Sequence, residues 1–361
     1  MTPVSSVMVA MSGGVDSSVA AALLVEAGDR VVGVTMRLVD GVCAEGQPET
    51  ACCSLEALHR ARDICRQLGV RHYTVDLRGQ FRQSVIDDFC NSYAGGETPN
   101  PCLRCNEHIK FGSLLRLARA SGFDYVATGH YATRGEKGGR QALSRGADRA
   151  KDQSYALYGL TQEQLAQVLL PLGSMSKRQV RSLAAERGLP SADVPDSQDL
   201  CFVPDGDYRG FLAARLSVAP GPIVDVGGAL VGTHQGLHHY TVGQRSGLST
   251  GSSQRLYVVA LDRSRNSVIV GPAEAVPRTW CYLREVNWVG REPPGPGRTV
   301  CGLAQTRYRS APTPARLTML AGGTARAHLP RNQTALAPGQ SMVLYQRDLV
   351  LGGGIIGEAW N

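Results

Sequence analysis

Apolar and polar positions follow two different periods in the first two hundred residues. Buried strands are predicted from short apolar runs at 7–10, 30–36, 72–76 and 125–129. Helices are predicted where apolar residues recur every three or four positions, at 17–27, 55–68, 81–93 and 111–121. This alternation is typical of a parallel sheet with helices on both faces, which binds ligands beyond the carboxyl ends of its strands.

The pattern changes at about Pro220 to glycine-rich turns and short alternating segments. Segments 256–261 and 267–270 predict a hairpin, and the proline- and glycine-rich stretch 291–297 predicts a loop. Further short β-like segments run to 343–345 and 354–360. The C-terminal part is therefore predicted to be a small β-barrel or sandwich.

Length and composition narrow the class of protein. A chain of 361 residues favours two or three domains, and no apolar run reaches the roughly 18 residues of a membrane span. The N-terminus has no secretory pattern, so we expect a cytoplasmic protein whose ten cysteines are reduced. From Asp262 onward there are twelve arginines, no lysine and six acidic residues, which indicates either a nucleic-acid partner or only a general preference for arginine.

The segment Ser12–Ser18, with the sequence SGGVDSS, lies between the first predicted strand and the first predicted helix. Its glycines allow a ligand to approach the backbone, and the helix start favours an anion. The loop has neither the lysine of a Walker A motif nor the GxGxxG spacing of a dinucleotide fold. It predicts a phosphate site, with a ligand-free glycine turn as the alternative.

The string SGGVDSS resembles the pyrophosphate loop of the PP-loop ATP pyrophosphatases. That resemblance implies an adenine nucleotide α-hydrolase-like domain that cleaves ATP between its α and β phosphates, with Asp16 placing Mg²⁺ or orienting the loop. Met36 at the second strand end is expected against the adenine, with an ordinary core position as the alternative, and Gly129 is expected to let the nucleotide approach. The ATP-binding residues implied are Ala10, Met11, Ser12, Gly13, Gly14, Val15, Asp16, Ser17, Met36 and Gly129.

Cysteines follow further along the chain, in TPNPCLRCN (Cys102 and Cys105) and in the segment of Cys201. A CxxC pair binds metal or exchanges thiol for disulfide, but no second pair follows at the spacing of a zinc finger. Cys52 and Cys53 are adjacent and are expected to pack. Together with CCS, ATGHYA, KDQSY, GQRSGL, QTRYR and PGQSMVLY, these strings resemble the tRNA-specific 2-thiouridylases of the MnmA type over 7–360.

The resemblance implies a sulfurtransferase with a PP-loop domain at 1–208, a small mostly-β domain at 209–273 and a C-terminal β-barrel at 274–361. ATP would adenylate the C2 oxygen of the wobble uridine of tRNA. A persulfide on Cys201 would deliver sulfur, and Cys105 would then form a disulfide with Cys201. Many members carry Asp where this chain has Cys102, so Cys102, Cys105 and Cys201 also form a candidate ligand set for a [4Fe–4S] cluster.

The family also implies contacts with a flipped-out base and the rest of the tRNA. The matching positions are Asn100, Pro101, Cys102, His130, Lys151, Asp152, Gln153, Arg307, Tyr308 and Gln340. A buried strand-end histidine is the alternative for His130. We expect a monomer with a persulfide donor, such as a cysteine desulfurase or relay protein. Another adenylating ligase, or an RNA-binding protein with a vestigial loop, are the alternative functions.

Overall fold

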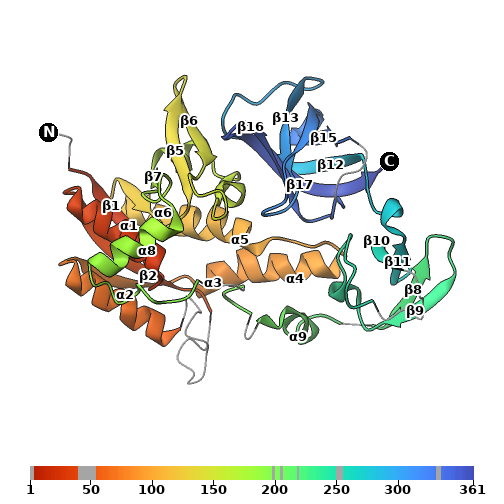
Figure 1. The fold of residues 1–361 in the computed structure, drawn as a ribbon, viewed down its shortest axis with the longest axis horizontal. Coiled ribbons are helices and arrows are strands. Elements are labelled where there is room, and N and C mark those ends of the chain that lie inside the picture. Colours follow the sequence, from red (N-terminus) through yellow and green to blue (C-terminus); the bar gives the residue numbers. More distant parts are fainter. Residues whose placement is uncertain are drawn as a thin grey trace. The chain divides into compact units, whose positions relative to one another are not determined.

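The computed structural model describes residues 4–39, 54–196, 200–203, 206–217, 219–248, 255–330 and 335–361. These residues form two compact units, drawn in Figure 1 and described one at a time below. The first unit draws on Met1–Ile86, Pro101–Gly206 and Asp348–Val350. The second draws on Asp87–Asn100, Asp207–Arg347 and Leu351–Asn361. The three domain boundaries expected from the sequence stay a prediction.

A five-stranded parallel sheet forms the centre of the first unit. Its strands are β1 (Ser6–Ala10), β2 (Arg30–Arg37), β3 (Arg71–Asp76), β4 (Tyr125–Ala127) and β7 (Val168–Leu169), in the order β3-β2-β1-β4-β7. The four predicted strands and their parallel arrangement are confirmed. Because β1 lies in the middle of the sheet and is entirely buried, the loop that follows it starts from a fixed position.

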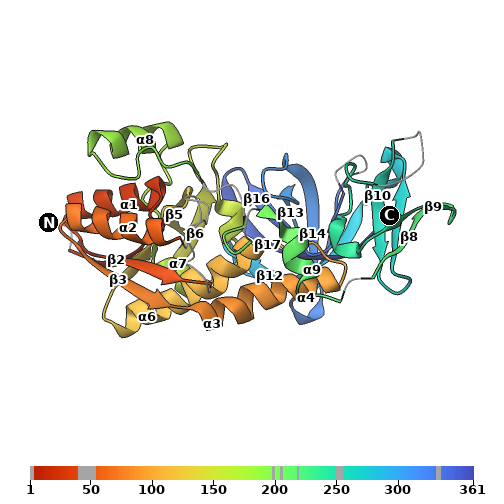
Figure 2. The same ribbon diagram turned by 90° about the horizontal axis from the view of Figure 1, so that it is seen from below.

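Helices cover both faces of this sheet. Figure 2 shows α1 (Val15–Glu26) and α2 (Leu55–Gln67) on one face, with α8 (Lys177–Glu186) packed against α1. α6 (Leu114–Ala120) lies on the other face. Apolar residues of β1, α1 and α8 share one core cluster, whose fully buried members include Val7, Val19 and Val180. The sheet with helices on two faces is the α/β architecture predicted from the periodicity.

Two predicted helices are longer and less regular than their periodicity indicated. The segment expected at 81–93 comprises α3 (Arg78–Phe81), a π-helical stretch at Arg82–Ile86 and α4 (Asp87–Ala94). The segment expected at 111–121 begins ten residues earlier, with α5 (Pro101–Arg104) and a π-helical stretch at Cys105–Ser113 before α6. π-helical turns place five residues rather than four in each hydrogen-bonded ring, so the apolar spacing shifts and hides these extensions.

Several elements of the first unit were not predicted. β5 (Ala132–Lys137) and β6 (Arg140–Arg145) form a hairpin whose two turn residues, Gly138 and Gly139, both have positive φ (60° and 73°). Two such residues are the requirement of a type I′ turn, so the Gly-Gly pair was a usable signal. The short helices α7 (Gln162–Ala166) and α8 each begin at a capping box, formed by Thr161 with Gln164 and by Ser176 with Gln179.

The second unit contains two β structures. A four-stranded sheet has the order β10-β11-β8-β9, with strands at Tyr257–Asp262, Ser267–Gly271, Gly221–Asp225 and Leu230–His234. A six-stranded barrel follows the order β12-β15-β14-β13-β16-β17 and closes through a β12–β17 pairing. Its strands are Trp280–Trp288, Ala325–His328, Thr313–Met319, Thr299–Gln305, Ser341–Gln346 and Leu349–Trp360. The remaining helix is α9 (Tyr208–Ala213). The predicted hairpin and C-terminal β-barrel are confirmed.

None of the helices in the described part of the chain is long and apolar enough to cross a membrane.

Candidate active site

The loop between β1 and α1 is built from glycine backbone and serine hydroxyls. Gly13 has φ of +73°, and a Cβ there would lie 2.3 Å from the backbone oxygen of Ala57, so only glycine fits. The hydroxyl of Ser17 accepts from the Ser12 amide at 3.2 Å and donates to the Gly14 carbonyl at 3.1 Å. Ser18 donates to the same carbonyl at 2.8 Å. The loop is therefore folded around the start of α1, where helix N–H groups favour an anion.

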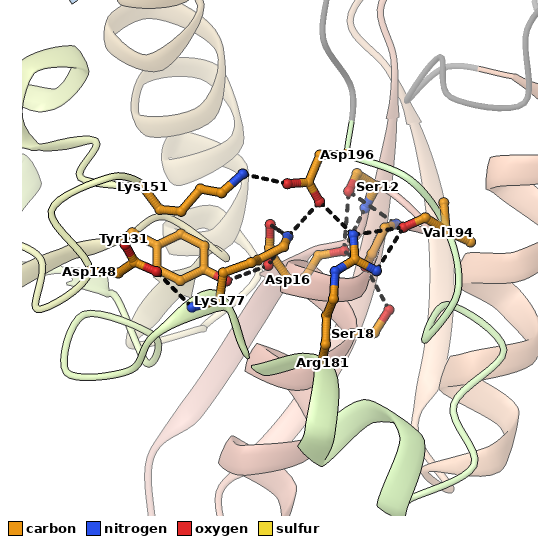
Figure 3. Close-up of polar contacts among 12 residues, drawn as sticks. Ser12, Asp16, Ser18, Tyr131, Asp148, Lys151, Lys177, Arg181, Val194 and Asp196 are labelled. Carbon is orange, nitrogen blue, oxygen red and sulfur yellow. Dashed lines mark hydrogen bonds and ion pairs between the residues drawn. The ribbon is translucent and has the colours of Figure 1, made fainter. Parts of the chain in front are cut away.

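Asp16, in the first turn of α1, is fixed by two partners from distant parts of the chain (Figure 3). The ammonium of Lys177 lies 2.8 Å from each of its carboxylate oxygens. The hydroxyl of Tyr131 donates to Oδ1 at 2.6 Å. Burial, with the charge of Asp16, raises the pKa of Tyr131 above its ordinary value, so this hydroxyl remains a donor. These contacts support the orienting role of Asp16 over direct binding of Mg²⁺, because donors already occupy both oxygens.

A second carboxylate, Asp196, binds three cations beside the loop (Figure 3). Lys151 contacts its Oδ2 at 2.7 Å, while Lys177 and Arg181 contact its Oδ1 at 2.7 and 2.9 Å. Burial alone would raise the pKa of Asp196, but the hydrogen bonds and charges of the two lysines outweigh it and lower the pKa to about 2. Arg181 also donates to the carbonyls of Ala192 and Val194. The chain segment that leads to Cys201 is thereby tied to α8.

The remaining predicted ATP residues divide into two groups. A Cβ on Gly129 would lie 2.7 Å from the carbonyl carbon of Asp16, so this glycine lets β4 approach the loop itself rather than, as expected, a nucleotide. Met11 is 2% exposed, and its amide and carbonyl bond to Val34 and Thr35, which makes it a core residue rather than an ATP contact. Met36 is half-buried near the end of β2, as expected for a residue beside the ligand. The placement of adenine against it stays a prediction.

The three cysteines of interest all belong to the first unit but differ in exposure. Cys102 on α5 is exposed, Cys105 at the start of the π-helical stretch is 8% exposed, and Cys201 is intermediate. Within the described ranges, no group of three or more His, Cys, Asp or Glu side chains is arranged to hold a metal ion. The structure therefore does not form the three-cysteine ligand set that a [4Fe–4S] cluster needs. Cys43, Cys52 and Cys53 lie outside the described residues.

The segment Lys151-Asp152-Gln153, predicted to contact tRNA, is largely engaged inside the first unit. The buried carboxylate of Asp152 accepts from Arg145, from the amide and hydroxyl of Ser154 and from the Gly146 amide, at 2.8–3.1 Å. A side-chain contact of Asp152 with tRNA is therefore contradicted, because every donor that it meets is internal. Gln153 accepts from the Tyr131 amide at 2.9 Å. Only Lys151, one-third exposed, also reaches solvent.

His130 is buried rather than displayed toward a ligand. It is 8% exposed, its Nδ1 lies 2.7 Å from the Thr128 hydroxyl, and its ring packs against Phe111. Burial, assisted by the charge of Lys110, lowers the pKa of His130 well below its ordinary value. The imidazole is thus neutral at neutral pH and gives no charge to a phosphate, which matches the alternative of a buried strand-end histidine.

Three further predicted contacts lie in the second unit. Gln340 donates to the carbonyl of Thr98 at 2.7 Å, and so holds the segment that ends in half-buried Asn100. Arg307 donates to the carbonyl of Val242 at 2.6 Å. Tyr308 is 38% exposed, with the guanidinium of Arg309 5.1 Å from its ring centre. Tyr308 therefore offers an aromatic face, whereas Gln340 and Arg307 bind backbone. Pro101, in the first unit, is buried at the start of α5.

Family models match nearly the whole chain. They are described as a tRNA methyl transferase HUP domain at residues 5–205, a tRNA methyl transferase PRC-barrel domain at 209–272 and an aminomethyltransferase β-barrel domain at 278–356. The tRNA-specific 2-thiouridylase MnmA of Moorella thermoacetica is 51% identical over 354 residues, which cover 97% of this chain and 98% of that protein. This chain belongs to the tRNA-specific 2-thiouridylase family.

Other 2-thiouridylases show the same full-length similarity. The MnmA protein of Chloroflexus aurantiacus is 50% identical over 356 residues, 98% of each chain. Among solved structures, a 4-thiouridine synthetase in complex with RNA and ATP has a TM-score of 0.35 and 18% identity, covering 58% of this chain and 50% of that chain. A similarity this low carries no argument, so the family assignment depends on the sequence relatives.

Sequence reasoning missed the most strongly connected residues of this 2-thiouridylase site. Lys177 and Asp196 lie outside every motif that we recognised as a ligand site, although Asp196 directly precedes the Ser197-Gln198-Asp199 string, which lies outside the described residues. Lys177 follows Ser176 at the start of a helix with a clear S-x-x-Q capping signal. That signal locates α8 but gives no sign that its first residue contacts a loop 161 positions away.

Proposed function

We propose that this chain is a tRNA 2-thiouridylase that uses ATP to replace the C2 oxygen of a uridine with sulfur. The observation that carries the proposal is the full-length identity of about half to 2-thiouridylases, in a chain with an intact SGGVDSS loop. The loop geometry supports ATP as a substrate: Gly13 opens space that a side chain would fill, and α1 begins there. ATP is taken as its magnesium complex, with Mg²⁺ as part of the substrate.

The chemistry explains why a phosphate loop and thiols occur together. Uridine O2 is a poor leaving group, so it first attacks the α-phosphate of ATP, and pyrophosphate departs toward the loop. The terminal sulfur of a persulfide on Cys201 then attacks C2, and AMP leaves with the oxygen. The Cys105 thiolate attacks the Cys201 sulfur, which frees 2-thiouridine and forms a Cys105–Cys201 disulfide. A two-electron thiol reductant restores both thiols.

Contacts with tRNA are proposed at fewer positions than the sequence indicated. Asn100 and Cys102 keep their proposed places beside the flipped base, and Tyr308 offers an exposed ring for stacking. Lys151 supplies a partly exposed cation. Gln340 and Arg307 act by holding Thr98 and Val242, and so shape the surface from behind. A persulfide-bearing protein is the proposed sulfur donor, and monomer the proposed state.

Labelled sulfur tests the function directly. The purified chain, ATP, unmodified tRNA and a persulfide donor carrying ³⁵S should give labelled 2-thiouridine after digestion to nucleosides, together with AMP and pyrophosphate. The matched variants Cys105→Ser and Cys201→Ser should each abolish labelling, whereas Cys301→Ser, an exposed thiol of the barrel, should not. Recovery of no labelled nucleoside from the wild type would overturn the proposal.

The same experiment separates the competing functions. Full product formation by a Cys105→Ser/Cys201→Ser double variant would favour an adenylating ligase of the same superfamily. Dependence on iron and acid-labile sulfide in anaerobically purified protein would favour a cluster-dependent route. A methylated nucleoside, formed only with a methyl donor, would favour the transfer named in the family descriptions. Binding of tRNA without any ATP-dependent change would indicate an RNA-binding protein.

A further inference from the structure

A chain of ion pairs joins the phosphate loop to the segment that carries Cys201. It runs from Asp16, in the first turn of α1, through Lys177 to Asp196, which precedes Cys201 by five positions. Figure 3 shows the ammonium of Lys177 between the two carboxylates. All four residues belong to the first unit. The link therefore connects the place where pyrophosphate departs to the thiol that is proposed to carry sulfur.

The position of Lys177 is fixed at its backbone. It is the first residue of α8, directly after the capping residue Ser176, and its amide donates to Asp148 at 2.9 Å. Its side chain is only 11% exposed. An ammonium has three N–H donors, and the contacts with Asp16 and Asp196 account for three oxygens at 2.7–2.8 Å. Lys177 must therefore give up one partner before it can contact a phosphate.

The two carboxylates differ in what remains when Lys177 leaves. Asp196 keeps two cations, Lys151 at 2.7 Å and Arg181 at 2.9 Å. Asp16 keeps only a neutral donor among its printed contacts here, the hydroxyl of Tyr131. Leaving a partly buried carboxylate without a cation costs more than leaving one that is still paired. The Asp196 contact is thus the cheaper one to exchange.

We infer that Lys177 is a positioning residue that couples the phosphate loop to the Cys201 segment. When a polyphosphate binds at the start of α1, the ammonium keeps Asp16 and turns from Asp196 to the phosphate. Lys177 then supplies the cation that the loop lacks in sequence, and the segment after Asp196 loses one of its ties to the loop. The inference rests on the proposed function only in naming the polyphosphate as that of ATP.

The reactivity of Cys201 toward iodoacetamide reports this coupling. The full chain is alkylated at fixed pH with and without magnesium pyrophosphate, and the Cys201 peptide is quantified by mass spectrometry. In the wild type, pyrophosphate should change the alkylation rate about fivefold or more, the scale of ordinary coupling between two sites. Lys177→Met keeps the aliphatic stem, loses the ammonium and should remove this response. The control Arg178→Met, at an exposed position beside it, should keep the response.

A second variant separates coupling from stability. Lys177→Met leaves two carboxylates facing each other, so a general loss of folding must be excluded. Lys177→Met/Asp196→Asn restores the local charge balance and should melt close to the wild type, yet still show no response to pyrophosphate. Recovery of the response in this double variant would overturn the inference, as would a full response in Lys177→Met.

The outcomes also distinguish this inference from the proposed function. A wild type that makes labelled 2-thiouridine but shows no effect of pyrophosphate on Cys201 refutes the coupling and leaves the function standing. A wild type that makes no 2-thiouridine but responds to pyrophosphate through Lys177 refutes the function and leaves the coupling standing.

Discussion

Replacement of Asp152 by alanine is expected to destabilise the first unit rather than to weaken tRNA binding specifically. The substitution removes the acceptors of Arg145, Gly146 and Ser154 and leaves the Arg145 guanidinium, only 13% exposed, without its carboxylate. Removing one partner of a buried ion pair typically costs about 3–5 kcal/mol. For a domain of this size, each kcal/mol lowers the melting temperature by about 2–4 °C. The expected decrease is therefore about 6–20 °C.

Differential scanning calorimetry of the full chain measures this decrease. Asp193→Ala, an exposed carboxylate in the same unit, serves as the control and should change stability by no more than about 0.5 kcal/mol. The affinity for tRNA is measured in parallel, well below the melting temperature of each variant. A melting temperature of Asp152→Ala within 1 °C or so of the wild type, combined with weaker tRNA binding, would refute the structural role and restore the original prediction of an RNA contact.

Three further predictions concern the loop, the barrel and pH. Gly13→Ala places a Cβ against a backbone carbonyl of α2 and should abolish ATP–pyrophosphate exchange, whereas Gly79→Ala, in open space, should leave exchange intact. Gln340→Leu removes the donor that holds the Thr98 carbonyl and should weaken tRNA binding about 2- to 12-fold in filter-binding assays; an unchanged affinity contradicts this positioning role. Because pairing lowers the pKa of Asp196 from 3.8 to about 2, its stabilisation is complete above about pH 4 and is lost as pH falls toward 2. The difference in melting temperature between wild type and Asp196→Asn should therefore disappear over that range, and a constant difference down to pH 2 contradicts the assignment.

The elements of the sheet could be predicted because local pattern determines them. Strands such as β1 are buried on both faces and give continuous apolar runs, and α1 and α2 have the spacing of one buried stripe or more. The helical stretch at Cys105–Ser113 was missed because its π-helical geometry breaks the spacing that the prediction used. β7, with two residues, is too short to carry any period.

The phosphate loop was predictable for a related reason: its chemistry lies within one short string. Gly13 and Ser17 act on neighbours a few residues away, so their spacing carries the information. The cation of the site comes instead from Lys177, 161 positions along the chain from Asp16. Such a contact depends on how α8 packs against α1, and a single sequence carries no record of that packing. The fold is therefore required to complete the site.

The segment Lys151-Asp152-Gln153 shows why polarity alone misled. Three consecutive polar residues indicated a solvated surface, yet their side chains bind three different parts of the first unit: Lys151 binds Asp196, Asp152 binds Arg145 at the end of β6, and Gln153 binds the amide of Tyr131. Tyr131 in turn donates to Asp16. A polar run has the same sequence signature whether it faces water or joins internal elements, because both environments satisfy hydrogen bonds. Here the run joins the β5–β6 hairpin, the phosphate loop and the Cys201 segment, so a substitution within it reaches the active site through its supports.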